Sequence, residues 1–261
     1  MTSLETNRKR RVIFYNLVEL LVKRELKVRY RGSFLGYLWS MLNPLLTMVV
    51  LSFIFTHLMR FKMENFSLFI LCGLLAWNFF NQSLLIGVNC IVNNASLLKK
   101  VKVPISLFPT VTVFSSLVNM VLALLPYFVI AIILKLDLTF NVFLLPLIII
   151  PFVFFTLGSI FLLASANVFF RDVAHSLEPV LMIAFYATPI IYPITMLPAE
   201  YRGFLMYNPM SHFVSGFRDV LFYGEMPSMP TLIWIYSLAI GFFIAGFLCF
   251  RKLSPKFIYK I

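Results

Sequence analysis

A run of 26 uncharged residues, from Phe34 to Met59, follows directly on a basic N-terminal stretch and constrains the fold more than any other feature. Nine Lys and Arg residues precede this run, within residues 1–33. About 20 apolar residues suffice for a helix to cross a bilayer, and Lys and Arg stay on the cytoplasmic side of a first span. The junction at Gly32 therefore predicts an integral membrane protein whose N-terminus lies in the cytoplasm.

The composition agrees with lipid as the main solvent of this chain. Hydrophobic residues make up 61% of it and charged residues 12%, whereas a soluble domain is about half apolar and about a quarter charged. Inside a bilayer every backbone polar group must be satisfied within the protein, which favours helices. We therefore expect an all-α integral membrane protein that forms a single transmembrane domain over residues 1–261.

Apolar runs between charged loops predict six transmembrane helices. With an internal N-terminus, 17 of the 22 Lys and Arg residues lie on the cytoplasmic side, while the acidic residues divide evenly. This is the asymmetry of the positive-inside rule, and it places both termini in the cytoplasm. The net charge of +12 is then explained by topology and anionic lipid, so it does not predict a nucleic-acid partner. The six helices are expected at 34–59, 66–90, 107–134, 141–170, 177–195 and 230–250.

Two further regions have helical patterns but do not span. Residues 1–33 are basic, with apolar residues at helical spacing, and predict an amphipathic helix in the cytoplasmic membrane interface. This helix is either only a membrane anchor, or an anchor that also contacts a partner or a substrate. Residues 198–223 contain two proline-started segments that predict short external re-entrant helices, with an irregular loop as the alternative. Their apolar bulk is expected to gate the outer end of a path, through Tyr201, Phe204, Tyr207, Phe213 and Phe217.

Sequence motifs for catalysis are missing. The chain has no phosphate-binding P-loop, no zinc-protease or nucleophile-elbow motif and no Cys/His cluster, so we predict no catalytic residue and no metal site. The centres of the six expected spans hold no charged residue, and ion-driven transporters need such groups. If the protein transports, its energy is expected to come from another subunit.

Two sets of side chains are candidates for substrate contact. Arg29 and Arg31 can each offer two donors to a phosphate group, and attraction to anionic lipid is the alternative explanation. Aromatic residues near the span ends can stack on sugar rings or simply face lipid. The aromatic candidates for a glycan path are Tyr37, Trp39, Phe185 and Tyr186.

Several short motifs, in order along essentially the whole chain, resemble those of polysaccharide-export ABC permeases. The first begins at Arg29-Tyr30-Arg31-Gly32-Ser33-Phe34-Leu35-Gly36-Tyr37-Leu38-Trp39 and continues to Asn43-Pro44. The others are Phe169-Phe170-Arg171-Asp172-Val173, Thr188-Pro189-Ile190-Ile191-Tyr192-Pro193, Leu197-Pro198 and Tyr207-Asn208-Pro209-Met210. Together they resemble permeases that export O-antigen, capsular polysaccharide or teichoic acid.

This resemblance implies a homodimeric permease in the bacterial plasma (inner) membrane, bound to two copies of a separate ABC ATPase. The cargo would be a polysaccharide, O-antigen first, carried on a polyprenyl diphosphate lipid. ATP and Mg²⁺ would belong to the ATPase, so the chain itself is expected to be no enzyme and to need no cofactor.

The resemblance also assigns roles to segments. The turn at Leu35 and Gly36 would lie near the lipid-linked head group, beside Arg29 and Arg31, and the 198–222 helices would be the external gate. Asn93–Val103 would be a coupling helix on the ATPase, with its lysines at the cytoplasmic surface and an apolar leucine ridge facing a groove. Its candidate residues are Asn94, Leu97, Leu98, Lys99, Lys100 and Lys102.

Two alternatives stay open at this point. One is an ABC permease of the same architecture that exports teichoic acid, a drug or a lipid. The other is an ATP-independent membrane enzyme or flippase acting on lipid-linked sugars. Such an enzyme would need clustered ionisable groups near one membrane face, where Asp172 and Glu178 are the only acidic residues after the first span.

Overall fold

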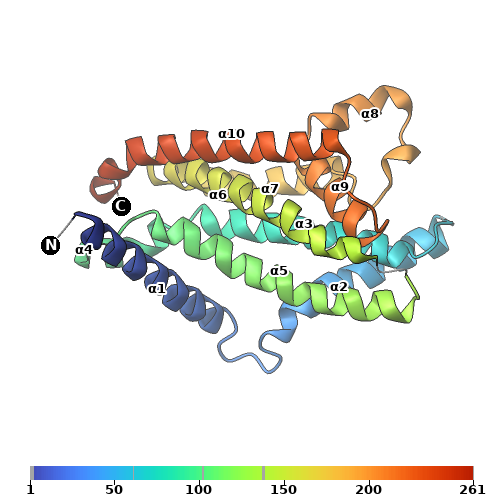
Figure 1. The fold of residues 1–261 in the computed structure, drawn as a ribbon, viewed down its shortest axis with the longest axis horizontal. Helices are drawn as coiled ribbons and strands as arrows, with labels where there is room; N and C mark the ends of the chain where they lie inside the picture. Colours follow the sequence, from blue (N-terminus) through green and yellow to red (C-terminus); the bar gives the residue numbers. More distant parts are fainter. Residues whose placement is uncertain (1–2, 61, 102, 137–138, 261) are drawn as a thin grey trace.

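The computed structural model describes residues 3–60, 62–101, 103–136 and 139–260, with side chains from Phe14 onward except at 199, 204 and 206. Within these ranges all regular structure is helical, which confirms the all-α prediction (Figure 1). The elements are α1 (Ser3–Arg29), α2 (Leu38–Phe53), η1 (Ile54–Leu58), α3 (Phe66–Gly87), η2 (Val92–Asn94), α4 (Ala95–Lys100), α5 (Leu107–Ile133), η3 (Phe140–Leu144), α6 (Leu145–Phe169), α7 (Asp172–Ala187), η4 (Ile194–Met196), α8 (Ala199–Met206), α9 (Pro209–Leu221), α10 (Met229–Leu253) and η5 (Ser254–Tyr259).

The centre of the bundle is α3, which packs against α2, α5, α6, α7 and α9. Most of its side chains are buried, including Leu68, Ile70 and Leu71 at 0% exposure. A helix that is apolar on every side can be buried in this way. By contrast, α2 and α10 are largely exposed within the single chain, so their apolar faces are open to lipid or to another protein.

The most extensive helix pairing is that of α6 with α10, and two glycines allow their backbones to approach closely. A Cβ at Gly158 would collide with the backbone of Phe242, and one at Gly246 would collide with the backbone of Gly158. Small residues allow helix backbones to approach closely in membranes, where van der Waals packing drives association. These two positions therefore fix α10 against the bundle.

Among the described residues, five helical segments are long and apolar enough to cross a membrane. They are Leu38–Leu58, Phe66–Gly87, Leu107–Ile133, Phe140–Phe169 and Met229–Tyr259. The first four have bounds within about four residues of the expected spans, whereas the last includes η5 and runs nine residues past its expected end at 250.

The helix expected over 177–195 is different. It is α7, which begins earlier, at Asp172, and ends at Ala187. Its 16 residues extend about 24 Å, short of the roughly 30 Å hydrocarbon core. The reason for the early end is Pro189, since the residue before a proline is driven out of the helical region, and Thr188 is indeed extended.

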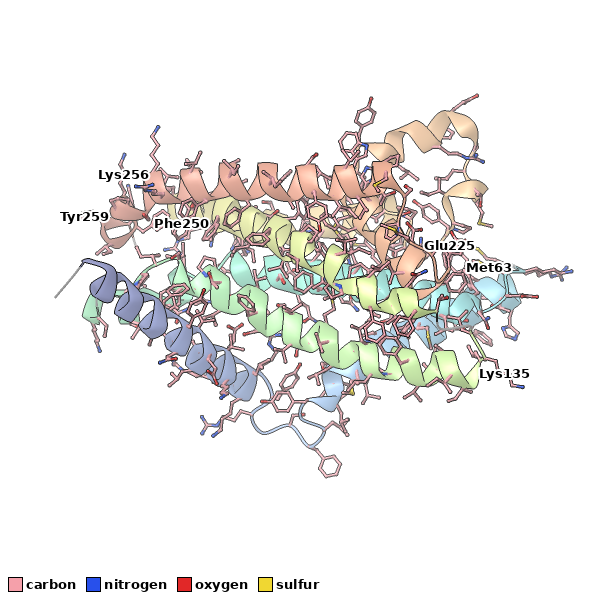
Figure 2. The ribbon with its side chains drawn as sticks, viewed as in Figure 1. Met63, Lys135, Glu225, Phe250, Lys256 and Tyr259 are labelled. Atoms are coloured by element: carbon pink, nitrogen blue, oxygen red, sulfur yellow. The ribbon has the colours of Figure 1, made fainter. Side chains whose placement is uncertain are left out.

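Two ends of the molecule are distinct. Both chain termini, α4 and the start of α1 lie at one end (Figure 1). Met63, Lys135 and Glu225 lie at the opposite end, away from Lys256 and Tyr259 (Figure 2). The labelled residues of the loops expected outside therefore lie at the end opposite to the C-terminal segment. We call the two ends the termini end and the loop end.

Candidate functional site

The turn between α1 and α2 contains the expected head-group residues. Gly32 and Gly36 both have positive φ, and the Gly36 N–H donates to Ser33 Oγ at 3.2 Å. Of the two arginines, Arg31 is exposed. Arg29 is engaged instead, because its Nη2 lies 3.1 Å from Glu25 Oε1 and both side chains are largely buried. Burial raises the pKa of Glu25 and the Arg29 charge opposes that rise. A phosphate at Arg29 would have to compete with Glu25.

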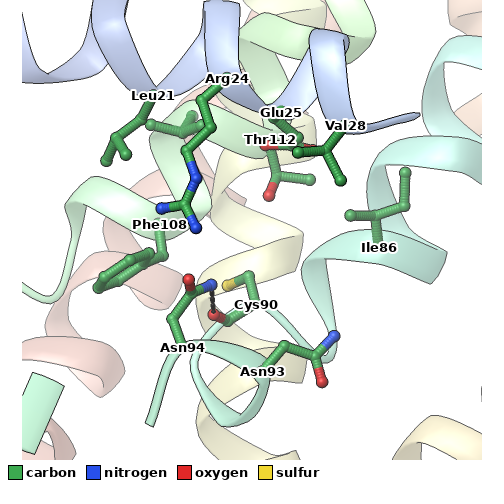
Figure 3. Close-up of a pocket in the computed structure, with 11 residues that line it drawn as sticks. Leu21, Arg24, Glu25, Val28, Ile86, Cys90, Asn93, Asn94, Phe108 and Thr112 are labelled. Atoms are coloured by element: carbon green, nitrogen blue, oxygen red, sulfur yellow. Dashed lines mark hydrogen bonds between the residues drawn. The ribbon is translucent and has the colours of Figure 1, made fainter. Parts of the chain in front are cut away.

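A cavity of about 310 Å³ lies beside this ion pair, between α1, the end of α3, η2 and α5 (Figure 3). Arg24 extends from α1 into it, facing Phe108 and Asn94. The Asn94 side chain donates from Nδ2 to the Cys90 carbonyl at 2.8 Å, which holds the turn before α4. The cavity therefore places the interface helix next to the segment expected to couple to an ATPase.

The residues expected to couple to an ATPase fall on η2 and α4, at the termini end. Lys99 and Lys100 are exposed, Leu97 is half-buried, and Lys102 lies outside the described residues. Leu98 corrects our expectation of a leucine ridge, because only 6% of it is exposed and it belongs to the hydrophobic core. A short helix with one leucine facing inward anchors itself on its own chain, so the free face of α4 is the lysine side.

The aromatic candidates for a glycan path lie on two elements. At the start of α2, Tyr37 and Trp39 are 46% and 40% exposed. In the last turn of α7, Tyr186 is 58% exposed, whereas Phe185 packs edge-on against Trp77 with ring centroids 5.5 Å apart. Three of the four are thus available for contact outside the chain, and Phe185 supports the packing of α7 on α3.

The gate candidates divide sharply at the loop end. Tyr201 and Tyr207 are 61% and 83% exposed, and the side chain of Phe204 lies outside the described residues. Phe213 and Phe217 are at 0% exposure, which corrects their assignment as gating bulk. Phe213 stacks on Phe152 of α6, with ring centroids 4.4 Å apart. The apolar face of α9 is therefore filled by the protein itself.

Arg218 of α9 is the most unusual side chain at this end, since it is charged and only 5% exposed. It donates from Nη1 to the Pro189 carbonyl and from Nη2 to the Ile190 carbonyl at 2.6 Å. Its Cζ lies 3.5 Å from the ring centroid of Phe69 on α3. Burial lowers its pKa to about 10, so it remains a cation at neutral pH. One guanidinium thus joins α9, α3 and the broken end of α7.

A second polar residue ties the same elements together. Asn208 caps α9, accepting at Oδ1 from the Met210 N–H at 3.0 Å, which is the standard role of Asn before a helix. Its Nδ2 donates to the Ala187 carbonyl at 3.1 Å and to Thr188 Oγ1 at 2.9 Å. These groups belong to the end of α7, where proline has removed the next helical turn. Together Asn208 and Arg218 satisfy the backbone that the break frees.

The sequence profile of the ABC-2 type transporter family matches residues 16–222, which include the turn, α4, the break after α7 and α9. The chain belongs to this family. An ABC-2 permease is the membrane component of a transporter, its ATPase is a separate partner, and it carries no cofactor of its own. The missing P-loop is explained by that division of labour.

Curated relatives within this family align along almost the whole chain. O-antigen export system permease protein RfbA of Myxococcus xanthus is 34% identical over 250 residues, covering 95% of this chain and 96% of that protein. A protein of the same name from Klebsiella pneumoniae is 31% identical, with 93% and 94% covered. Polysialic acid transport protein KpsM of Escherichia coli is 26% identical, with 90% and 92% covered.

Sequence reasoning missed the role of Arg218 in this ABC-2 permease, although a signal was present. The apolar stripe of α9 runs through Met210, Phe213, Val214 and Phe217 at helical spacing, and position 218 continues it. An arginine in an apolar stripe must find polar partners inside the protein.

Proposed function

We propose that this chain is the membrane-spanning permease of an ATP-driven exporter of lipid-linked polysaccharide, with O-antigen carried on polyprenyl diphosphate as its cargo. The observation that carries this proposal is the alignment with O-antigen export permeases at 30–34% identity over 93–95% of the chain. The apolar spans add support, because Leu38–Leu58, Phe66–Gly87, Leu107–Ile133 and Phe140–Phe169 contain no charged residue. Ion-driven transport lacks its usual groups there.

The working unit is a homodimer of this chain with two ATPase subunits in the bacterial inner membrane. The exposed apolar residues of α2 and α7 support contact with a partner permease, because Val49, Val50, Met182 and Ile183 are each more than half exposed within the single chain. In a dimer these faces, with Tyr37, Trp39 and Tyr186, would border the glycan path. Arg31 beside Leu35 and Gly36 would receive the diphosphate.

The proposed topology has six spans, with α7 and the turn residues that follow it up to Ile194 forming the short fifth one. Both termini are cytoplasmic, so the termini end faces the ATPase and the loop end faces outward. The charge distribution supports this orientation. Reporter fusions after Lys62 and after Ile261 should report opposite sides of the membrane. Two reporters on the same side would contradict the topology.

The proposed function is tested by purifying the permease together with the ABC ATPase encoded beside it. We expect a complex whose ATP hydrolysis rises when polyprenyl-diphosphate-linked glycan is added. A permease that binds no ATPase, or whose complex ignores lipid-linked glycans and responds to a drug or a phospholipid, would overturn the assignment. An activity on lipid-linked sugars without ATP would favour the membrane enzyme or flippase.

A further inference from the structure

The C-terminal segment η5 is basic and folded, and it continues directly from α10. Phe257 within it is at 0% exposure. Its ring packs against Phe250 of α10 and Phe169 of α6, with ring centroids 5.5 Å and 6.1 Å apart. Lysines alone would retain this end in the cytoplasm, and that task needs no buried aromatic side chain. The folding of η5 therefore calls for a further role.

The position of η5 supplies one, because η5 contacts α4. Both elements lie at the termini end (Figures 1 and 2). Leu98 anchors α4 and Phe257 anchors η5 in the hydrophobic core. The exposed residues of the pair include Lys99, Lys100, Lys256, Ile258 and Tyr259, and Val101 directly after α4 is exposed as well.

We propose that α4 and η5 form one docking surface for the ATPase, which rests on the proposed function and extends its interface beyond the coupling helix. The surface combines a cationic rim with a projecting aromatic residue, since Tyr259 is 89% exposed. Protein interfaces favour this arrangement, with tyrosine as an anchor in a pocket and charges around it. The matching partner is an ATPase face with an apolar pocket and acidic neighbours.

The membrane surface is the competing partner for such residues, and the geometry favours the ATPase. The 25 residues of α10 extend about 37 Å, which exceeds the roughly 30 Å hydrocarbon core. The six residues of η5 add about 12 Å to that length, so α10 and η5 together are longer than the roughly 40–45 Å of a bilayer with its head groups. The contact of η5 with α4 also directs it toward the segment already expected to meet the ATPase.

The same packing gives the surface a mechanical connection. Phe169, which Phe257 contacts, is the last residue of α6, and α7 begins three residues later at Asp172. A push on η5 by the ATPase would therefore reach the start of α7 as well as α4. Phe257 is a positioning residue in this arrangement, because it places η5 and touches no partner.

The test uses the full chain co-expressed with its ATPase and purified in detergent. The double variant Lys256→Glu/Tyr259→Ala changes exposed residues only and should fold. We expect the ratio of ATPase to permease to fall at least fivefold, with matching loss of glycan-stimulated ATP hydrolysis. Lys135→Glu, an equal charge reversal at the loop end, is the control and should keep both values. Phe257→Ala should reproduce the loss if it still inserts.

The outcomes separate the two levels of the proposal. A double variant that retains the wild-type ratio and stimulation overturns the docking surface and leaves the proposed function intact. The same is true if export fails in cells while the ratio in detergent is unchanged, because the surface would then contact lipid. If the wild-type permease retains no ATPase, the proposed function fails and the docking surface with it.

Discussion

The two short helices at the loop end, α8 and α9, are neighbours in sequence with opposite relations to the protein. α9 is capped by Asn208 and bonded through Arg218 to the Ile190 carbonyl, and its residues Phe213 and Phe217 are buried. α8 contacts α9 weakly and exposes Tyr201. Both were expected to form one gate. The difference indicates that α9 belongs to the fixed frame and α8 is the part able to act as a cover.

The way each helix is held supports this division. α8 is tied mainly to its own connecting segment, because Arg202 donates from Nε to the Leu197 carbonyl at 2.8 Å and from Nη2 to the Thr195 carbonyl at 2.9 Å. α9 is tied to α3, α6 and the end of α7. Substitutions that remove contacts of α9 should therefore lower the stability of the whole protein. Substitutions in α8 should instead change how well the outer end of the path is closed.

The largest effect on stability is expected from Phe213→Ala. Deleting a buried phenylalanine costs about 3–5 kcal/mol through lost packing and the cavity left behind. For a chain of this size that lowers the melting temperature by roughly 10 °C, measurable on the purified protein in detergent. Phe213→Leu is the control and should lose far less. A loss below about 1 kcal/mol for the alanine variant would show that α9 is not part of the core.

Arg218 provides the next largest effect. Methionine fills similar space but leaves the carbonyls of Pro189 and Ile190 without their donor, at about 1–3 kcal/mol for each buried group. Arg218→Lys keeps the charge yet offers a point donor in place of a planar fork, so partial recovery is expected. Thermal melts of both variants test this. If Arg218→Met were as stable as the wild type, the contacts of Arg218 with the end of α7 would not stabilise the fold.

The spans show what could be predicted from the sequence. Most of their ends were placed within a few residues because charges and prolines mark them, and membrane insertion depends on the chain's own hydropathy. The end of α7 was missed although Pro189 was noted, since the turn residues after it are as apolar as those of a helix. The apolar stripe of α9 was visible, but a stripe does not tell whether protein or lipid covers it.

The candidate site was less predictable, for reasons of distance and length. The hydrogen-bond acceptors of Arg218 are backbone carbonyls 28 and 29 residues away, and no pattern of side chains in the sequence predicts them. α4 has six residues, too few for a period that would reveal that Leu98 faces inward. The contact of η5 with α4 joins segments that are separated by most of the chain. Such contacts come from packing and not from local pattern.

A smaller effect concerns pH and Asp219, which follows Arg218. Burial and the nearby Glu225 raise the pKa of Asp219 to about 6, and Arg218 opposes the rise. A carboxyl whose pKa is raised on folding stabilises the protein below its unfolded pKa of 3.8 and loses that contribution as the pH passes 6. Because the group is partly exposed, we expect roughly 1 kcal/mol less stability at pH 7 than at pH 5.

The control for this titration is Asp219→Asn, which cannot ionise. Its melting temperature should change less between pH 5 and pH 7 than that of the wild type. Glu225→Gln should reduce the wild-type dependence in part, since it removes one of the two causes. An unchanged pH dependence in Asp219→Asn would assign the titration to another group.

The smallest effect on stability, and the most informative for function, is expected from Tyr201→Ala/Tyr207→Ala. Both side chains are exposed, so their loss should change stability by no more than about 0.5 kcal/mol. A path wide enough for a polysaccharide must nevertheless be closed at rest, and narrow apolar constrictions exclude water. If α8 is the cover, these rings supply its bulk. Vesicles holding the double variant should then leak a small solute severalfold faster without ATP.

Tyr223→Ala, at a half-exposed tyrosine just after α9, is the control, and its vesicles should leak no faster than those with the wild type. A double variant that melts normally and remains impermeable would show that α8 does not close the path, and closure would then have to come from the frame that α9 and Arg218 build.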